Sequence, residues 1–372
     1  MKVLHVYRTY FPDPPGGLQE AIRQICLSTQ RHGVENTVFT LSPSPVPRVL
    51  ERPEARVIRH RSWAAPASCD LGDPSAFGVF RKLAREADVV HYLFPWPFAD
   101  LLHHLANPGT PAVLTYVSDI VRQRWLGRLY SPLMHKTLAD MRWIVANAPA
   151  YAQTSPVLAT PEVTRKLRII PLGICGDSGP TEQDDGVLNA HGLDTGAPFV
   201  LFLGVLRYYK GLHTLIEAAA SVQGRIVIAG EGPGGPALRE QVKRLGLENV
   251  RFTGALSEAG KRSLLKHCRA LVLPSHLRSE AYGMVLVEAA MFGKPMISCE
   301  IGTGTSFVNR DGETGFVVPA EDPTALAGAM NRLLADAAEA QRLGLAARER
   351  YARLFSGEAL GAAYAGLFRD AV

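Results

Sequence analysis

The stretch P-S-H-L-R-S-E-A-Y-G-M-V-L-V-E-A, from Pro274 to Ala289, carries two carboxylates eight positions apart, Glu280 and Glu288. Gly283 lies between them and an apolar run follows it, which predicts a helix that starts near Tyr282. The first amides of a helix have no partner inside it and, with the helix dipole, attract an anion. The stretch therefore predicts a phosphate site with a carboxylate on either side, as a nucleotide sugar would need. The alternative is an ordinary loop glutamate followed by a solvated helix glutamate.

The predicted phosphate donors are the first backbone amides of this helix. They belong to Gly283, Met284, Val285 and Leu286, and the ring of Tyr282 directly precedes them.

Length and composition favour a soluble α/β protein of two domains. The chain has 372 residues, of which 47% are hydrophobic and 20% charged. Its formal net charge of +5 suits anionic substrates or an anionic membrane face, but it is too small and diffuse to predict nucleic-acid binding. The five cysteines have no C-x-x-C spacing, so we expect reduced thiols, no metal site and a cytoplasmic protein. We find neither a signal peptide nor an apolar run of the roughly 18–20 residues that span a bilayer.

The N-terminal half begins as a strand, a Gly-rich turn and a helix. The strand is predicted over Lys2 to Tyr7 and the helix over Leu18 to Arg31, with Gly16 and Gly17 between them. Paired glycines let the backbone approach an anion, so both are candidates for contact with the donor phosphates. Most such pairs only make turns, and the G-x-G-x-x-G spacing of a nicotinamide site is absent.

Alternating strand and helix patterns predict two Rossmann-like, doubly wound parallel-sheet domains facing a central cleft. We expect the first domain over 1–175, a polar linker over 176–196 and the second domain over 197–350. The final segment, 351–372, is predicted to be a helix that packs back on the first domain. The Pro- and Arg-rich stretch 42–74 is predicted to contain long surface loops besides a strand at Arg56–Arg59, and Asp311 to Pro319 is predicted to form a structural hairpin.

One segment of the first domain combines a candidate catalytic residue with a basic helix. Asp119 follows a predicted strand end, where active sites of open α/β sheets lie. The segment 122–142 after it mixes Arg, His and Lys with Trp, Tyr, Leu and Met, a pattern that suits an anionic lipid surface. The alternative, which we favour slightly, is a solvated cationic face over an ordinary packed helix.

The second domain has further candidate ligand groups at predicted strand ends. Arg207 and Lys210 lie in G-V-L-R-Y-Y-K-G before a helix, where two cations would neutralise a diphosphate. A tight turn at another strand end supplies Gly230, Glu231 and Gly232. Either segment taken alone could be a plain surface loop.

Together these stretches resemble the family 4 glycosyltransferases, retaining nucleotide-sugar enzymes of the GT-B fold. The resemblance covers nearly the whole chain and rests on Gly16-Gly17, Y-K-G (209–211), G-E-G-P (230–233), the opening stretch, and G-K-P-M-I-S-C-E-I-G-T-G-T (293–305). The segments V-Y-R-T-Y-F-P-D, S-D-I-V-R-Q and L-R-Y-Y-K-G also look like those of O-antigen mannosyl- and rhamnosyltransferases of Gram-negative bacteria.

The resemblance implies roles for the candidate residues. Glu280 would contact the donor sugar at the reaction centre, and Glu288 the ribose hydroxyls. Arg207 and Lys210 would stabilise the diphosphate leaving group without a metal or other cofactor. The implied donor is a GDP-sugar (GDP-mannose or GDP-rhamnose) rather than a UDP-sugar. The implied acceptor is a lipid-linked saccharide of lipopolysaccharide biosynthesis, reached by peripheral contact with the inner membrane.

Two positions depart from the family pattern. Val117 stands where many relatives carry a histidine, and Val205 where many carry an arginine. Asp119 or another polar group would compensate for Val117, and Arg207 for Val205. Two alternatives stay open: a nucleotide-sugar 2-epimerase, which shares the two-domain architecture, and a nucleotide-sugar-binding protein that has lost the histidine and its activity.

Overall fold

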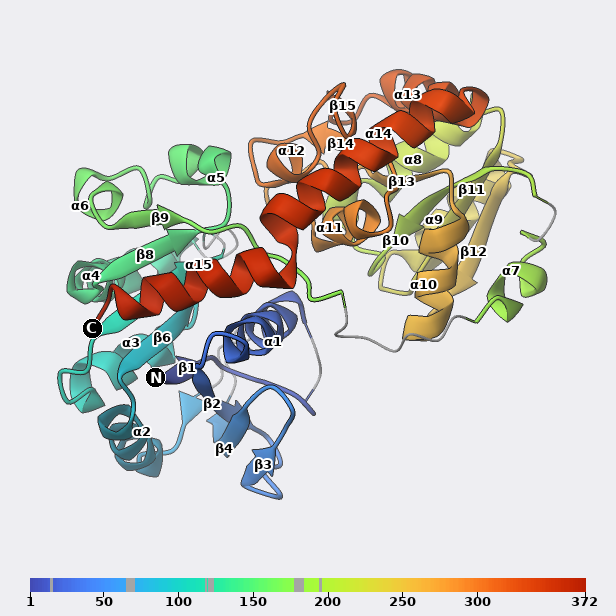
Figure 1. Ribbon diagram of the computed structural model, residues 1–372. Coiled ribbons are helices and arrows are strands. Elements are labelled where there is room, and N and C mark those ends of the chain that lie inside the picture. Colours follow the sequence, from blue (N-terminus) through green and yellow to red (C-terminus); the bar gives the residue numbers. More distant parts are fainter. Residues whose placement is uncertain (14–15, 65–70, 118, 120–123, 177–183, 194–195) are drawn as a thin grey trace. The chain divides into compact units, whose positions relative to one another are not determined.

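The computed structural model in Figure 1 describes the chain except for residues 14–15, 65–70, 118, 120–123, 177–183 and 194–195 and the side chains of residues 124–129. The described chain divides into two compact units. The first unit comprises Met1–Cys175 together with Ser356–Val372, and the second comprises Gly176–Phe355.

The first unit is built on a nine-stranded sheet of order β3-β4-β2-β1-β6-β7-β8-β9, with β5 paired to β4. Its strands are β1 (Lys2–Val6), β2 (Glu35–Ser42), β3 (Val49–Glu51), β4 (Arg56–Ala64), β5 (Leu71–Gly72), β6 (Val89–Phe94), β7 (Ala112–Tyr116), β8 (Trp143–Ala146) and β9 (Leu167–Ile169). All pairs are parallel except β3 with β4 and β4 with β5. The central strands β6 and β7 are buried along their whole length because helices cover both faces of the sheet.

The connections of the first unit are helical. They are α1 (Gly17–Gln30), α2 (Ser75–Glu86), α3 (Pro97–Ala106), α4 (Arg124–Asp140), α5 (Pro149–Thr154) and α6 (Pro161–Thr164). The last helix of the chain, α15 (Gly357–Arg369), packs beside α1 (Figure 1). A Cβ on Gly361 would lie 2.3 Å from the carbonyl oxygen of Ser28, so only glycine permits this approach of the two helices.

A chain of hydrogen bonds crosses the core of the first unit to α15. The Asn36 amide nitrogen donates to a main-chain carbonyl of α1 (3.0 Å), so its oxygen accepts from Nε2 of His5 (2.9 Å). Nδ1 of His5 then accepts from Nδ1 of His91 (2.9 Å), whose Nε2 accepts from Thr115 (2.7 Å). The Tyr364 hydroxyl on α15 completes the chain by donating to Thr115 (2.9 Å). The two buried histidines are therefore held neutral, each with one donor and one acceptor in use.

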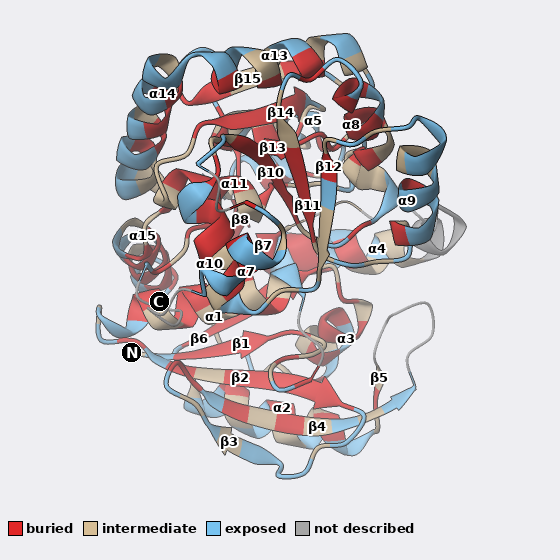
Figure 2. Cartoon of the chain, turned by 90° about the vertical axis from the view of Figure 1, so that its right-hand side faces the viewer, coloured by how far each residue is buried: buried red, intermediate tan, exposed pale blue. Residues whose placement is uncertain are grey.

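The second unit is a six-stranded, wholly parallel sheet of order β12-β11-β10-β13-β14-β15. Its strands are β10 (Phe199–Leu203), β11 (Arg225–Ala229), β12 (Val250–Gly254), β13 (Ala270–Leu273), β14 (Met296–Glu300) and β15 (Gly315–Pro319). Its helices are α7 (Gly186–Ala190), α8 (Leu212–Ala219), α9 (Gly235–Arg244), α10 (Glu258–His267), α11 (Met284–Met291), α12 (Thr305–Val308), α13 (Pro323–Ala335) and α14 (Ala337–Arg350). Helices cover both faces of this sheet as well. Figure 2 shows that strands such as β10 and β13 are therefore buried, whereas α13 and α14 have solvent-exposed outer faces.

The structure corrects four details of the sequence-based reading. The stretch 42–74 contains all of β3, β4 and β5, so it has more strand than the predicted segment Arg56–Arg59. Asp311 to Pro319 is a turn followed by β15, which pairs in parallel with β14, so the predicted hairpin is wrong. The segment predicted as a single helix from 351 starts with a π-helical turn, Tyr351–Phe355, and α15 begins only at Gly357. The predicted linker contains the short helix α7.

Two further observations concern thiols and membranes. Four cysteines, Cys26, Cys175, Cys268 and Cys299, are buried and form no disulfide bond, and Cys69 lies outside the described residues. Across the described part of the chain, no helix is both long enough and apolar enough to cross a bilayer.

Candidate active site

An ion pair between Lys210 and Glu280 is the centre of the candidate site in the second unit. Lys210 Nζ lies 2.7 Å from Glu280 Oε2, and each side chain is 12% exposed. Lys210 ends a 3-10 turn, Tyr208–Lys210, that follows β10, while Glu280 lies in the loop that follows β13. Because β10 and β13 are neighbours in a parallel sheet, their following loops meet at its carboxyl edge.

The two loops touch through their backbones. Gly211, the residue after Lys210, has φ 68°, and a Cβ there would lie 1.9 Å from the carbonyl oxygen of Pro274. Glycine is therefore required, both by the left-handed conformation and by the approach of the second loop. The Y-K-G motif thus has a structural reason: its glycine brings Lys210 within reach of Glu280.

A third loop, which follows β14, supports Glu280. The Thr303 hydroxyl donates to the Glu280 carbonyl oxygen (2.8 Å), and the Gly304 amide donates to the Ala281 carbonyl oxygen (2.9 Å). Arg278 donates to the Gly302 carbonyl oxygen (2.8 Å). The hydroxyl-rich G-T-G-T segment therefore holds the loop that carries Glu280 in place, mainly through hydrogen bonds to the loop's backbone.

Helix α11 starts at Met284, two residues later than predicted, with Gly283 as its N-cap. Gly283 has φ 81°, a conformation that ends the preceding loop and is available to glycine at low cost. The Leu286 amide donates to the Gly283 carbonyl oxygen (2.8 Å), so this predicted phosphate donor already has a partner. Met284 and Val285 are half-buried at the helix start, whereas Tyr282 is buried.

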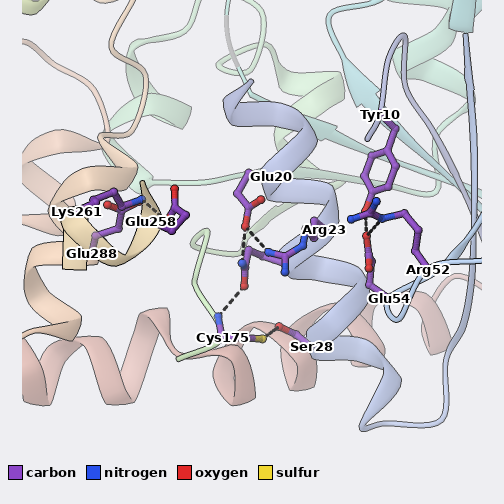
Figure 3. Close-up of polar contacts among 11 residues, drawn as sticks. Tyr10, Glu20, Arg23, Ser28, Arg52, Glu54, Cys175, Glu258, Lys261 and Glu288 are labelled. Atoms are coloured by element: carbon purple, nitrogen blue, oxygen red, sulfur yellow. Dashed lines mark hydrogen bonds and ion pairs between the residues drawn. The ribbon is translucent and has the colours of Figure 1, made fainter. Parts of the chain in front are cut away.

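Glu288, the second carboxylate of the opening stretch, lies beside a lysine that the sequence analysis missed. Lys261 Nζ on α10 is 3.2 Å from Glu288 Oε1 and 3.1 Å from Glu258 Oε2 (Figure 3). Burial by itself lowers the pKa of Lys261, but the two carboxylates outweigh it and the pKa is raised. The sequence shows only the i,i+3 pair of Glu258 and Lys261, because Glu288 is 27 residues away from Lys261.

The remaining candidates of the second unit have less enclosed positions. Arg207 and Glu231 are exposed. Gly230 and Gly232 pack against the loop after β10. A Cβ on Gly230 would lie 2.1 Å from the Gly204 carbonyl oxygen, and a Cβ on Gly232 would lie 2.7 Å from the Leu206 amide nitrogen. Close backbone packing therefore explains both glycines without a ligand, and their contact with the donor stays a prediction.

In the first unit, the predicted residues also lie at the carboxyl edge of the sheet. Gly16 caps α1 in an extended conformation, and Gly17 is the first residue of that helix, directly after the loop from β1. Asp119 follows β7. Its Oδ1 accepts from the hydroxyls of Tyr116 (3.0 Å) and Ser155 (2.7 Å). The surrounding hydroxyls fix Asp119 in place, as a positioned carboxylate requires. Val117, where a histidine is expected, is half-buried.

Part of α4 falls outside the described side chains, including the positions of Arg124 and Arg128. In the part that is described, His135 and Lys136 are exposed, while Met134 and Leu138 are buried. This half of the helix has a polar outer face, on which the exposed Asp140 lies near Lys136 in sequence, and an apolar inner face.

Solved structures of similar fold cover essentially the whole chain. Sucrose-phosphate synthase from Thermosynechococcus elongatus matches with a TM-score of 0.78 and 22% identity, covering 99% of this chain and 98% of that one. HepE of Anabaena, solved in complex with UDP, matches with a TM-score of 0.79 and 20% identity, covering 99% and 100%. The fold is thus the GT-B fold of glycosyltransferases, as predicted.

Sequence comparisons specify the family. A glycosyl transferase 4-like domain matches residues 16–173, and the glycosyl transferases group 1 model matches residues 186–350. The D-rhamnosyltransferase WbpZ of Pseudomonas aeruginosa is 45% identical over 357 residues, 96% of this chain and 92% of that protein. The O-antigen chain mannosyltransferase C of Escherichia coli is 40% identical over 369 residues, 99% of this chain and 98% of that protein. The chain belongs to the group 1 glycosyltransferases, which confirms the family that the motifs predict.

Proposed function

We propose that this glycosyltransferase moves a hexose of the mannose or rhamnose type from a GDP-sugar to a saccharide acceptor of O-antigen biosynthesis. The observation that carries the proposal is the ion pair of Lys210 and Glu280 at the carboxyl edge of the second sheet, close in sequence to the start of α11. The names of the two similar transferases favour these sugars and this pathway.

The proposed chemistry uses the chain's own positive groups to stabilise the departing nucleoside diphosphate. Lys210, Arg207 and the first amides of α11 would bind the diphosphate, so that charge developing on the leaving oxygen meets fixed partners. Glu280 would then exchange its contact with Lys210 for the sugar hydroxyls near the reacting carbon. Glu288 would bind the ribose. Retention of configuration and independence from a metal are parts of this proposal.

We further propose that the acceptor is lipid-linked and that the enzyme binds the cytoplasmic membrane surface peripherally. The basic residues of the segment 122–142 in the sequence, together with the exposed His135 and Lys136 and the buried Met134 and Leu138, favour a helix that would lie against anionic lipid. Flotation with vesicles containing anionic lipid, at low and at high salt, tests this part. Binding that is equal for neutral and anionic vesicles would contradict it.

The experiment that tests the function is a product analysis with purified enzyme. GDP-mannose, GDP-rhamnose and a UDP-sugar are each supplied with and without a lipid-linked saccharide, and the new anomeric linkage is assigned by NMR. We expect transfer from a GDP-sugar only when acceptor is present, with the donor's anomeric configuration kept. Turnover of the donor alone to an epimer would identify an epimerase instead. Nucleotide binding without transfer, unchanged by Val117→His, would identify a binding protein.

A further inference from the structure

A cluster of three metal-ligating side chains lies in the second unit beside the candidate site. It consists of His213, His276 and Glu321, whose potential ligand atoms all lie within 4.8 Å of one another. His213 belongs to the first turn of α8, His276 to the loop after β13, and Glu321 to the turn after β15. Three separate loops at the carboxyl edge of one sheet thus supply one group each.

The ring of His276 is the clearest sign that the cluster has a ligand. Neither ring nitrogen is accessible to solvent, and neither makes a hydrogen bond of good geometry with a described residue, although the Tyr209 backbone lies near the ring. Buried polar atoms without a partner are rare in folded proteins because each forfeits the hydrogen bonds it had in water. A bound cation would give one of these nitrogens the partner that it needs.

Aromatic contacts fix the orientation of both imidazoles. The ring of Tyr208 stacks on His213 at a centroid distance of 5.4 Å and meets the edge of His276 at 4.9 Å. The two imidazoles are 5.0 Å apart and nearly perpendicular, at 88°. Tyr208 is 71% exposed, and the part of its ring that is covered packs against these two imidazoles.

The backbone of Glu321 is strained. Its φ is 58°, and it is the one non-glycine residue with positive φ in the described part of the chain. Such a conformation is costly for a residue with a Cβ and long side chain, and it persists where the surroundings or a function require it. Here it places a carboxylate at the third corner of the cluster.

We propose that His213, His276 and Glu321 bind a divalent transition-metal ion of the zinc class. Two imidazoles and one carboxylate are a ligand set that zinc takes, with a fourth position left for water. Zinc bonds of about 2.0–2.1 Å separate tetrahedral ligand atoms by about 3.4 Å, so ligand atoms that lie within 4.8 Å of one another must approach by at most about 1.4 Å. Glu321 is exposed and can make that adjustment.

The ion would order the loops that carry the candidate active-site pair, rather than take part in sugar transfer. Tyr208 and His213 flank Lys210 in sequence, and His276 precedes Glu280 by four residues in the same loop. Tying the three segments together restricts the motion of both members of the ion pair. Zinc binding can be measured without donor or acceptor, so a failure to bind zinc would leave the proposed sugar transfer untouched, and the reverse.

A second cluster, His103, His104 and Asp140 in the first unit, provides the matched control. There, His103 Nδ1 lies 3.2 Å from the Tyr92 hydroxyl and His104 Nε2 lies 3.1 Å from the Thr137 hydroxyl. The other nitrogens face Asp140 at 3.6 and 3.5 Å. All four ring nitrogens thus have protein neighbours, in contrast to those of His276.

The test is a calorimetric titration of the chelator-stripped full chain with zinc chloride. A separate titration with cobalt, followed by visible absorption, reports the coordination of the bound ion. Glu321→Asn is the main variant, because asparagine tolerates positive φ better than glutamate and the fold is expected to persist. We expect Glu321→Asn and His213→Ala each to weaken zinc binding by at least about tenfold, and zinc to raise the thermal midpoint of the wild type but not of Glu321→Asn. Asp140→Ala should bind zinc as the wild type does. The inference is overturned if the wild type binds no zinc, if Glu321→Asn binds it equally well, or if Asp140→Ala is the variant that loses it.

Discussion

The ammonium group of Lys210 and the carboxylate of Glu280 lie 2.7 Å apart, although 70 residues separate them in the chain. Both side chains are 12% exposed, so each charge depends on the other for much of its stabilisation. A ligand that carries phosphate and hydroxyl groups would satisfy both charges at once. The pair is therefore suited to separate on binding, with Lys210 turning to phosphate and Glu280 to sugar.

The role of Lys210 can be measured by binding. Lys210→Ala should weaken GDP binding by about 1.5–3 kcal/mol, roughly 10- to 150-fold, because a charge-assisted contact to phosphate is lost. Isothermal calorimetry with GDP measures this. Lys243→Ala, a change in the last turn of α9, should leave the affinity unchanged. Equal affinity in Lys210→Ala and the wild type would show that this lysine does not contact the diphosphate.

The role of Glu280 can be measured by rate. Glu280→Gln keeps the size of the side chain but removes its charge, and we expect turnover to fall by about two orders of magnitude or more, with the fold retained. Initial rates of sugar transfer, with circular dichroism as a check of folding, provide the measurement. Glu240→Gln on the exposed face of α9 is the control. Turnover close to wild type in Glu280→Gln would exclude a role at the reacting carbon.

Lys261 allows a comparison of two ion pairs that share one cation. Glu258 is 65% exposed, so Glu258→Ala should change the unfolding free energy by less than about 1 kcal/mol. Glu288 is only 20% exposed, and Lys261→Met removes the Lys261–Glu288 ion pair, which should cost about 1–3 kcal/mol. Denaturant unfolding of the two variants checks this order. A larger loss in Glu258→Ala would mean that the Lys261–Glu288 contact contributes little.

The buried histidine pair predicts sensitivity to acid. Burial lowers the pKa of His5 from 6.5 to about 4, and burial and the neighbouring His5 lower the pKa of His91 well below its usual value. The unfolded chain therefore takes up protons first, so stability is present above pH 6.5 and is lost as pH falls from there toward 4. For His5 alone the loss is about 3 kcal/mol, at about 1.4 kcal/mol per pKa unit. Unfolding free energies between pH 7.5 and 4.5 test this, and a flat profile would contradict it.

The hydroxyl of Tyr364 is the donor at the α15 end of the same chain of hydrogen bonds. Tyr364→Phe removes that donor but keeps the ring in the core, so we expect a loss of about 0.5–1.5 kcal/mol. The comparison is with Tyr364→Ala, which also removes the packing and should cost about 3–5 kcal/mol. Denaturant unfolding measures both. If the two variants lost the same amount, the hydroxyl bond rather than the packing of the ring would account for the whole effect.

The regular elements of the second unit were predictable because their signals are local. Phe199–Leu203, Arg225–Ala229 and Ala270–Leu273 are short apolar runs bounded by turn residues, and each is a strand with those bounds. The start of α11 was misplaced because a left-handed Gly283 ends the loop, and a backbone angle of this kind is not visible in an apolar pattern. The parallel pairing of β15 was missed because a strand after a tight turn looks like half of a hairpin.

The candidate site was only partly predictable, for a related reason. Glu280, Lys210 and Glu288 could be named from the sequence because they belong to short motifs, and their roles toward the donor stay predictions. The contact of Lys261 with Glu288 and the cluster around His276 depend on which strands are neighbours, and single residues far apart in sequence give no signal of that. The predicted roles of Gly16, Gly17 and Asp119 toward the donor stay predictions.

The position of α15 has a consequence for the order in which this protein acquires its structure during translation. The first unit consists of residues 1–175 and 356–372, so its last helix is synthesised only after the entire second unit. Leu360, Tyr364 and Phe368 from that helix belong to the same buried cluster as Val3 and Val89. The apolar surface that α15 covers therefore stays exposed on the nascent first unit while about 180 further residues are synthesised. At typical synthesis rates this takes roughly 10–40 s. The half of the protein that is synthesised first is the half that is finished last.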